Sequence, residues 1–390
     1  MKNKQAIMII YVCMKIINIF LGPFLVAYFI KISTQTIVDL SIFNILNYMS
    51  LCFFGIIVGY VTERKHSLGA FRLGVALRFI YILMIMLLGS KITYHFGLIA
   101  FVYGFSSMFY HLPFNLYHTD CVENSERNDF EFKINAAKNL LSILVPFLLG
   151  AIITTTNYQL TAIIILMFSV TQIVSSFYLK ALPTSDNKYD LFGALKKFIK
   201  DKQISKMLLA DYLNGLTFSD GVLSTVITVL IMYSFKSDFK LGIINSITAI
   251  LSLIIIYLYS KYYKGKDDKK IICIAGLLIF FSMILLSLKL SNFTVILYNV
   301  IFEVLGVGLL TFIYGLRLFN LAKDKIADKE KTEYWVVREL SLNIGRVTGY
   351  LLLLIIGILG LKYLKYFLII LSLIVLGFTL CIAKINKNEF

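Results

Sequence analysis

The sequence contains little charge and little proline for its length. Only 15% of its 390 residues are charged and only 4 are proline, whereas 59% are hydrophobic. A water-soluble chain of this size cannot cover such an apolar interior with so few charged side chains. The composition therefore excludes an ordinary soluble enzyme or binding domain and indicates a chain that lies within a lipid bilayer.

Motifs that mark catalysis or cofactor binding are also lacking. The 5 cysteines are scattered, without the spacing of a metal site or a disulfide framework. No glycine-rich phosphate loop occurs, so the chain is not expected to hydrolyse ATP. Acidic residues number only 22 against 38 lysines and arginines, and these cations lie in short loops between apolar runs. That pattern is typical of membrane-protein loops, and we expect neither a nucleic acid, a metal nor a cofactor as a partner.

Apolar runs long enough to cross a bilayer as helices, roughly 20–25 residues each, recur along the whole chain. They predict an all-α integral membrane protein with twelve transmembrane helices in two six-helix bundles. The bundles are expected at 1–181 and 204–390, joined by a cytoplasmic linker at 182–203. The predicted spans are 6–31, 36–61, 71–89, 93–117, 134–156, 158–180, 204–234, 239–262, 270–288, 292–319, 334–359 and 361–383.

The loops between these spans alternate in character, and this alternation predicts the orientation. One set is short and weakly charged, whereas the other is longer and holds most of the lysines and arginines. The positive-inside rule then places both termini in the cytoplasm of a multi-pass cell-membrane protein, which we expect to be a monomer. The basic N-terminus resembles a secretion signal, but Lys15 interrupts the apolar run and no cleavage site follows, so we interpret it as a retained first span.

Within the linker, apolar residues recur at helical spacing while lysines occupy the other side. This pattern predicts an amphipathic helix that lies on anionic membrane lipids, and a disordered charged tether is the alternative. The apolar positions are Leu191, Leu195, Phe198 and Ile199, and the basic ones are Lys196, Lys197, Lys200 and Lys202.

The two-half architecture, the inner termini and the basic linker resemble the major facilitator superfamily of secondary transporters. A motif of that family is partly matched by the run Gly59-Tyr-Val-Thr-Glu63-Arg64, although His66 and Ser67 depart from its last two positions. A weaker likeness to the family's antiporter signature involves Pro146 and Gly150, with Val145 in place of a glycine. The subfamily is not identified by these residues.

The resemblance implies a cytoplasmic gate at this motif. Glu63 and Arg64, following Gly59, would pair with the opening turn of the predicted span at 334–359 when the transporter opens outward. Arg338 and Glu339 offer both signs of charge there.

Charges inside a spanning segment are costly, so each is a candidate functional residue. The resemblance implies a central cavity lined by the first, fourth, seventh and tenth spans. Lys15, His111, Asp220 and Glu303 fall on these four spans, one on each. Two further cations, Arg78 and Arg346, lie in other spans, and Arg78 is expected to be a structural partner rather than a cavity residue.

These residues predict proton-coupling and substrate-binding roles. Glu303, and secondly Asp220, are the candidate proton carriers, while Lys15, His111 and Arg346 are the candidate substrate contacts. The alternative is that the carboxylates form permanent ion pairs with Lys15 or Arg346 that hold the bundle together.

The predicted function is secondary active transport by alternating access. We expect proton-coupled antiport that exports a small amphipathic or drug-like molecule, with membrane lipids as surroundings. A solute symporter and a lipid flippase remain alternatives within transport. A membrane enzyme is less favoured, because it would need an Asp/His/Glu cluster and only His111, His118 and Asp120 offer one.

Overall fold

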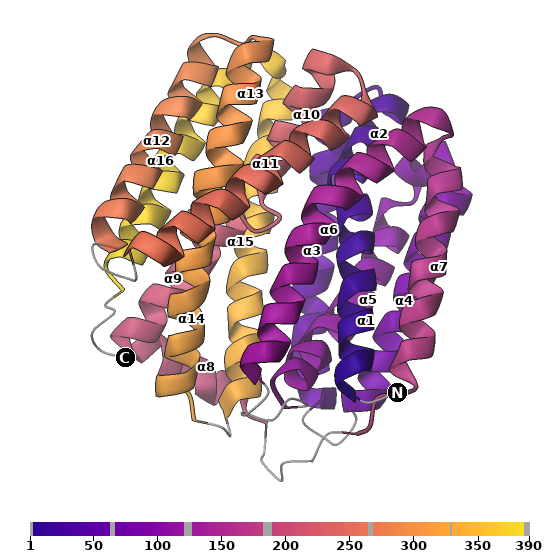
Figure 1. Cartoon of the computed structure of the whole chain (residues 1–390), viewed down its shortest axis with the longest axis vertical. Helices are drawn as coiled ribbons and strands as arrows, with labels where there is room; N and C mark the ends of the chain where they lie inside the picture. The colour runs from indigo at the N-terminus through magenta and orange to yellow at the C-terminus, as the bar shows by residue number, and fades with distance from the viewer. Residues whose placement is uncertain are drawn as a thin grey trace.

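A computed structural model describes residues 3–62, 67–120, 127–181, 189–263, 268–327 and 330–385. Within these ranges the chain is almost entirely helical and contains no strand, which confirms the predicted all-α class. Figure 1 shows long helices that run roughly side by side between two ends of the molecule. We call the end at which the first helix begins, at Asn3, the terminal face, and the other end the opposite face.

The first half of the chain crosses repeatedly between the two faces. Its first crossing is built from three consecutive elements with a kink at Gly22, and its third ends in a short 3₁₀ turn. The elements are α1 (Asn3–Ile19), η1 (Phe20–Phe24), α2 (Leu25–Ile32), α3 (Thr36–Val61), α4 (Ser67–Leu88), η3 (Gly89–Tyr94), α5 (Phe96–Asp120), α6 (Arg127–Thr155) and α7 (Tyr158–Ser176).

The second half follows a short connecting helix and repeats this crossing pattern. The elements are α8 (Leu191–Lys200), α9 (Lys202–Thr217), α10 (Val222–Phe235), α11 (Asp238–Leu258), η4 (Tyr259–Tyr263), α12 (Asp268–Leu288), α13 (Asn292–Ile301), η5 (Phe302–Leu310), α14 (Thr311–Lys325), α15 (Lys331–Leu359), η7 (Leu361–Tyr363) and α16 (Leu364–Ala383).

The predicted spans coincide with these helices. In the described part of the chain, 11 helices are long and apolar enough to cross a membrane. The predicted span 93–117 corresponds to α5, which is not among the eleven because polar residues such as Ser106, Ser107 and His111 lower its hydropathy. α5 nevertheless packs along both α3 and α4. The chain is therefore a multi-pass helical membrane protein.

One predicted span is interrupted. The sequence predicted a continuous helix over 204–234 with Asp220 inside it, and this prediction is wrong. α9 ends at Thr217 and α10 begins at Val222, and Asp220 between them adopts a left-handed backbone with φ of 52°. Aspartate tolerates this conformation better than most residues, because its short side chain can hydrogen-bond locally. The break leaves two half-helices that meet at Asp220.

Other spans contain π-helical segments, among them η1, η4 and η5. In η1, Pro23 lacks an N–H group and Gly22 has non-helical φ/ψ angles of −89° and −106°, so the helix kinks there. In η5 the segment carries Glu303 in its first turn. Single π-helical turns redirect side chains and are frequent at functional sites.

The predicted amphipathic helix in the linker is present as α8. Asp190 begins it by accepting a hydrogen bond from the Gly193 amide at 3.0 Å. Its buried face consists of Leu191, Ala194 and Phe198, and the helix packs against α15. Of the predicted apolar positions, Leu191 and Phe198 are buried against the protein, whereas Ile199 is exposed. Residues 182–188 lie outside the described ranges.

The two halves lie side by side and share two long contacts. Figure 1 shows the indigo and magenta helices on one side and the orange and yellow helices on the other. Across the boundary α3 packs along α15, and α6 packs along α11. A side chain at Gly242 would place its Cβ 2.4 Å from the carbonyl oxygen of Pro146, so only glycine permits this approach of α11 to α6.

Candidate functional site

A cavity of about 580 Å³ lies where the two halves meet. Its walls come from both sides of the boundary: α1 to α6 of the first half and α10, α11, η5 and α15 of the second, together with the break at Asp220. The cavity contains all five residues that the sequence proposed for coupling and substrate contact. These are Lys15, His111, Asp220, Glu303 and Arg346.

Three other charged residues also line the cavity. Arg78 does so although the sequence favoured a structural role outside it, and Glu339 does so although the resemblance placed it at the cytoplasmic gate. Lys138 on α6 was not singled out. The sequence could have identified it by its position inside the predicted span 134–156, because a lysine there is as costly as any other intramembrane charge.

The break at Asp220 is contacted by side chains from α15 and from α3. The Arg346 guanidinium donates to the Ser219 carbonyl at 2.8 Å and lies 3.4 Å from the Asp220 carboxylate. Tyr48, from the first half, donates its hydroxyl to the Asp220 carbonyl at 3.0 Å, and Arg346 lies over its ring at 5.0 Å. These contacts join α3, the break and α15 into one polar cluster across the boundary.

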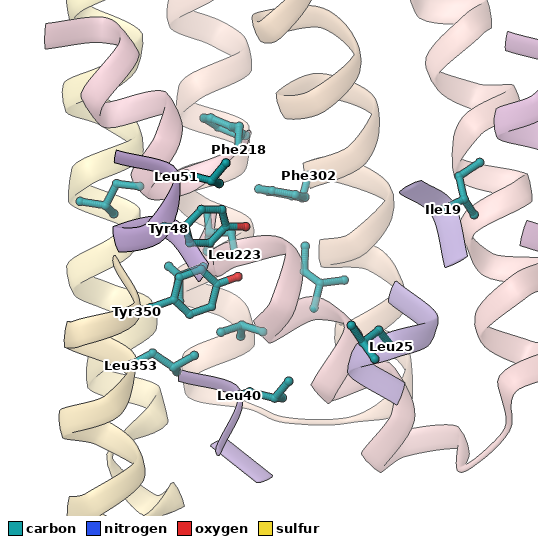
Figure 2. Close-up of a cluster of buried hydrophobic side chains, with 14 of the residues drawn as sticks. Ile19, Leu25, Leu40, Tyr48, Leu51, Phe218, Leu223, Phe302, Tyr350 and Leu353 are labelled. Carbon is teal, nitrogen blue, oxygen red and sulfur yellow. The ribbon is translucent and has the colours of Figure 1, made fainter. Parts of the chain in front are cut away.

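Aromatic side chains pack together next to this polar cluster. Figure 2 shows Tyr48, Tyr350, Phe218 and Phe302 gathered in one region. The Tyr48 and Tyr350 rings stack at 5.7 Å and the Phe218 and Phe302 rings at 5.3 Å. Because Phe302 immediately precedes Glu303, this packing fixes the backbone next to a cavity carboxylate.

Glu303 occupies a different electrostatic environment from Asp220. Its backbone carbonyl accepts a hydrogen bond from the Ser252 hydroxyl at 3.0 Å, which ties η5 to α11. Its side chain is within electrostatic range of Lys15, but no ion pair within 4 Å holds it among the residues that the structure describes. The alternative of a permanent pair between Glu303 and Arg346 is not observed, since Arg346 approaches Asp220 instead.

The residues expected at the cytoplasmic gate are only partly described. Glu63 and Arg64 lie outside the described ranges. Arg338 lies 3.1 Å from the Asp211 carboxylate and donates to Glu339 at 2.8 Å, so its charge is satisfied within the second half. Gly59 packs where a Cβ would lie 2.9 Å from a methyl group of Val336, so the start of the motif touches α15.

The opposite face is closed by contacts between the halves. Lys31 at the end of α2 donates to the Asp238 carboxylate at the start of α11. Further along α11, the Ser246 hydroxyl donates to the Ile143 carbonyl of α6 at 2.6 Å. An ion pair at this end and a hydrogen bond further along α11 therefore join the two halves. No group of three or more metal-ligating side chains occurs in the part of the chain searched.

Comparison with known proteins places this geometry in a structural class. No protein-family profile matches the chain. A relative from Bacillus subtilis (strain 168), the uncharacterized protein YqgE, is 25% identical over 326 residues, covering 82% of this chain and 74% of the relative.

Solved transporter structures align with nearly the whole chain. A bacterial homologue of the iron transporter ferroportin, in an inward-facing state, is 15% identical with a TM-score of 0.70, covering 98% of this chain and 97% of its own. A POT family transporter in complex with a thioalcohol-conjugated peptide is 14% identical with a TM-score of 0.71, covering 97% and 94%. The nucleoside transporter NupG is 15% identical with a TM-score of 0.66, covering 98% of both chains. The chain therefore has the fold of the major facilitator transporters.

Proposed function

We propose that the protein is a secondary transporter that works by alternating access. The observation that carries this proposal is a charged cavity enclosed between two halves, with wall residues from both. Rocking of one half against the other would expose such a cavity to each side of the membrane in turn. The two moving units would be the six-helix bundles expected from the sequence, at 1–181 and 204–390. The linker at 182–203 joins them.

Proton coupling is the second part of the proposal, with Glu303 as the carrier. Glu303 lines the cavity without a close ion pair in the described chain, whereas Asp220 is already near Arg346. A carboxylate that is not held by a fixed cation can gain and lose a proton as its access to water changes. Lys15, His111 and Arg346 then remain as candidate substrate contacts, and Asp220 becomes part of the hinge between α9 and α10.

We propose a solute that carries polar or charged groups, because the lining combines charged and asparagine side chains with apolar residues. Asparagine side chains face it from several helices, in addition to the charged groups. Polar groups placed in a cavity fix ligand orientation and specificity. Antiport with export and symport with uptake are both compatible with this lining. A polar or charged solute needs no apolar path wide enough for a lipid, so we favour a solute transporter over a flippase.

Proteoliposomes with an imposed pH gradient test this function. Candidate polar solutes are added outside, and their accumulation is measured in both gradient directions. We expect at least one solute to accumulate only with the gradient, and the productive direction distinguishes export from uptake. Equal uptake with and without a gradient would contradict proton coupling, and no protein-dependent uptake of any solute would contradict transport.

The first prediction concerns orientation, for which we propose a cytoplasmic terminal face. Single cysteines are placed at Lys200 on α8 and at Thr155 at the end of α6, both exposed, on a cysteine-free background. An impermeant thiol reagent added to intact cells should label Thr155→Cys and not Lys200→Cys, because positive loops stay inside. Labelling of Lys200→Cys alone would reverse the proposed topology.

The second prediction concerns closure of the opposite face. Asp238→Asn removes the ion pair with Lys31 and should shift the population towards an outward-open state. A partly exposed pair is worth roughly 0.2–1 kcal/mol, so labelling of a cavity reporter, Thr228→Cys, should quicken by about 1.4- to fivefold. The exposed neighbour Lys240, which contacts the Phe235 ring, provides the control variant Lys240→Gln. Unchanged labelling in Asp238→Asn would argue against a gate here.

A further inference from the structure

Arg78 on α4 is a buried cation with unused hydrogen-bonding capacity. It is only 3% exposed, yet it lines the cavity. Its Nη2 donates to the Asn18 side chain on α1, and the guanidinium lies 5.3 Å from the centre of the Tyr110 ring. Its Nε and Nη1 are buried without a hydrogen-bond partner in the described chain. An arginine has five N–H donors in a fixed fork, and part of this fork is open.

Packing of α4 against α5 holds Arg78 in this place. One turn before it, a Cβ at Gly74 would lie 2.4 Å from the backbone of Phe109, so only glycine allows α4 to approach α5 so closely. Arg78 lies one turn further along this interface and is buried there. Its orientation into the cavity wall is therefore set by the fold.

Among the residues that the structure describes, no carboxylate forms an ion pair with Arg78. The acidic groups that act on it electrostatically are Tyr110, Tyr103 and Tyr81, and tyrosine is neutral at physiological pH. By contrast, the other arginines of this region are matched, Arg346 with Asp220 and Arg338 with Asp211. An unpaired buried charge is costly and persists in proteins where a partner is supplied.

The charged lining is also divided between the halves. The first half supplies cations, Lys15 and Lys138 in addition to Arg78, whereas the second half supplies the carboxylates. Among the described lining residues, four cations (Lys15, Arg78, Lys138 and Arg346) face three carboxylates (Asp220, Glu303 and Glu339). Arg346 pairs with Asp220, and Glu339 pairs with Arg338 outside the lining. Among the described lining residues, Arg78 and Lys138 are therefore cations without an ion pair.

We propose that Arg78 binds an anionic group of the transported substrate, a carboxylate or a phosphate. This inference rests on the proposed transport function and names its substrate class. The unpartnered N–H groups of the guanidinium can donate charge-assisted hydrogen bonds to such a group, for which arginine is well suited. Lys15 and Lys138 make the same wall attractive to an anion, and the carboxylates of the second half face the remainder of the substrate.

Binding to the purified protein without a gradient tests this proposal separately from transport. The probes are succinate, the dipeptide alanyl-alanine, inorganic phosphate and glycerol 3-phosphate, with succinamide, alanyl-alanine amide and glycerol as uncharged-end analogues. A ligand that binds only the folded state raises the melting temperature in a saturable way. We expect such a shift from at least one anion and not from its analogue, and the two probe classes distinguish a carboxylate from a phosphate substrate.

Variants of Arg78 locate the site. Arg78→Gln should weaken binding of that anion by about 10- to 100-fold, the equivalent of one lost charge-assisted hydrogen bond, and Arg78→Lys should weaken it less. Arg72→Gln on the same helix is the matched control, because Arg72 donates to the Ser176 carbonyl and does not line the cavity. Wild-type affinity in Arg78→Gln, or no melting shift from any anionic probe, would overturn the proposal. If the wild type binds the anion but shows no gradient-driven transport, only the proposed proton coupling is contradicted.

Stability of the ligand-free protein gives an independent readout. Because Arg78 lacks a counter-charge, Arg78→Gln should melt at the same temperature as the wild type or higher. Arg317→Gln is the comparison, since Arg317 is equally buried but donates to the carbonyls of Ile382 and Ile385, and this variant should melt lower. A fall in Arg78→Gln as large as that in Arg317→Gln would assign Arg78 to structure instead of substrate.

Discussion

Replacing Glu303 by glutamine should abolish solute accumulation driven by a pH gradient while exchange of solute across the membrane survives. Glutamine keeps the size and hydrogen-bonding ability of the side chain but cannot carry a proton between the two sides. Glu303 lies eleven residues after Asn292, which is roughly 16 Å along a helix at 1.5 Å per residue. That distance is about half the thickness of a hydrocarbon core of about 30 Å. Glu303 would then lie near the middle of the bilayer, where a proton carrier can be reached from each side.

Two measurements in proteoliposomes decide the role of Glu303. Gradient-driven accumulation should fall to the level reached without a gradient, and counterflow of preloaded solute should continue. Asp39→Asn is the matched control, because Asp39 is a carboxylate outside the cavity that accepts a hydrogen bond from Ser33 at 2.6 Å. If Glu303 were instead a structural group, Glu303→Gln would reduce the melting temperature and both transport modes together. Full gradient-driven activity would contradict both roles.

The Arg338→Gln variant should lower the free energy of unfolding by about 3–5 kcal/mol, since removing one partner of a buried ion pair leaves the other charge uncompensated. Asp211 is 0% exposed, and Arg338 lies 3.1 Å from it. Tyr314 also donates its hydroxyl to this carboxylate, so α9, α14 and α15 meet at one buried charge. The loss should therefore loosen the packing of the second half.

A double-mutant cycle measures this contact. Asp211→Asn combined with Arg338→Gln should recover a large part of the stability lost in the single variant, because neither member is left charged. Chemical denaturation in detergent gives the free energies, and Arg72→Gln provides a less buried arginine for comparison. Equal stability of Arg338→Gln and the wild type would contradict the pairing. It would also leave Arg338 free for the cytoplasmic gate that the resemblance implies.

The positions of the spans and much of the cavity lining could be predicted from the sequence. Apolar runs report helices directly, because a bilayer requires each backbone polar group to be satisfied within its own segment. Charges within those runs are rare and costly, so Lys15, Asp220 and Glu303 stood out without any tertiary information. All three line the cavity between the halves.

The partners of these charges were decided only by the tertiary structure. Whether Arg346 lies near Asp220 or Glu303 depends on how separate helices approach one another, and span hydropathy carries no information about that approach. The same applies to Arg78, whose place in the cavity wall follows from the close packing of α4 and α5. The break at Asp220 also escaped the sequence, because a left-handed residue between two apolar half-helices changes the path of the chain without changing its hydropathy. Hydropathy is a local property that the bilayer selects, whereas ion pairing is a contact that only the folded arrangement creates.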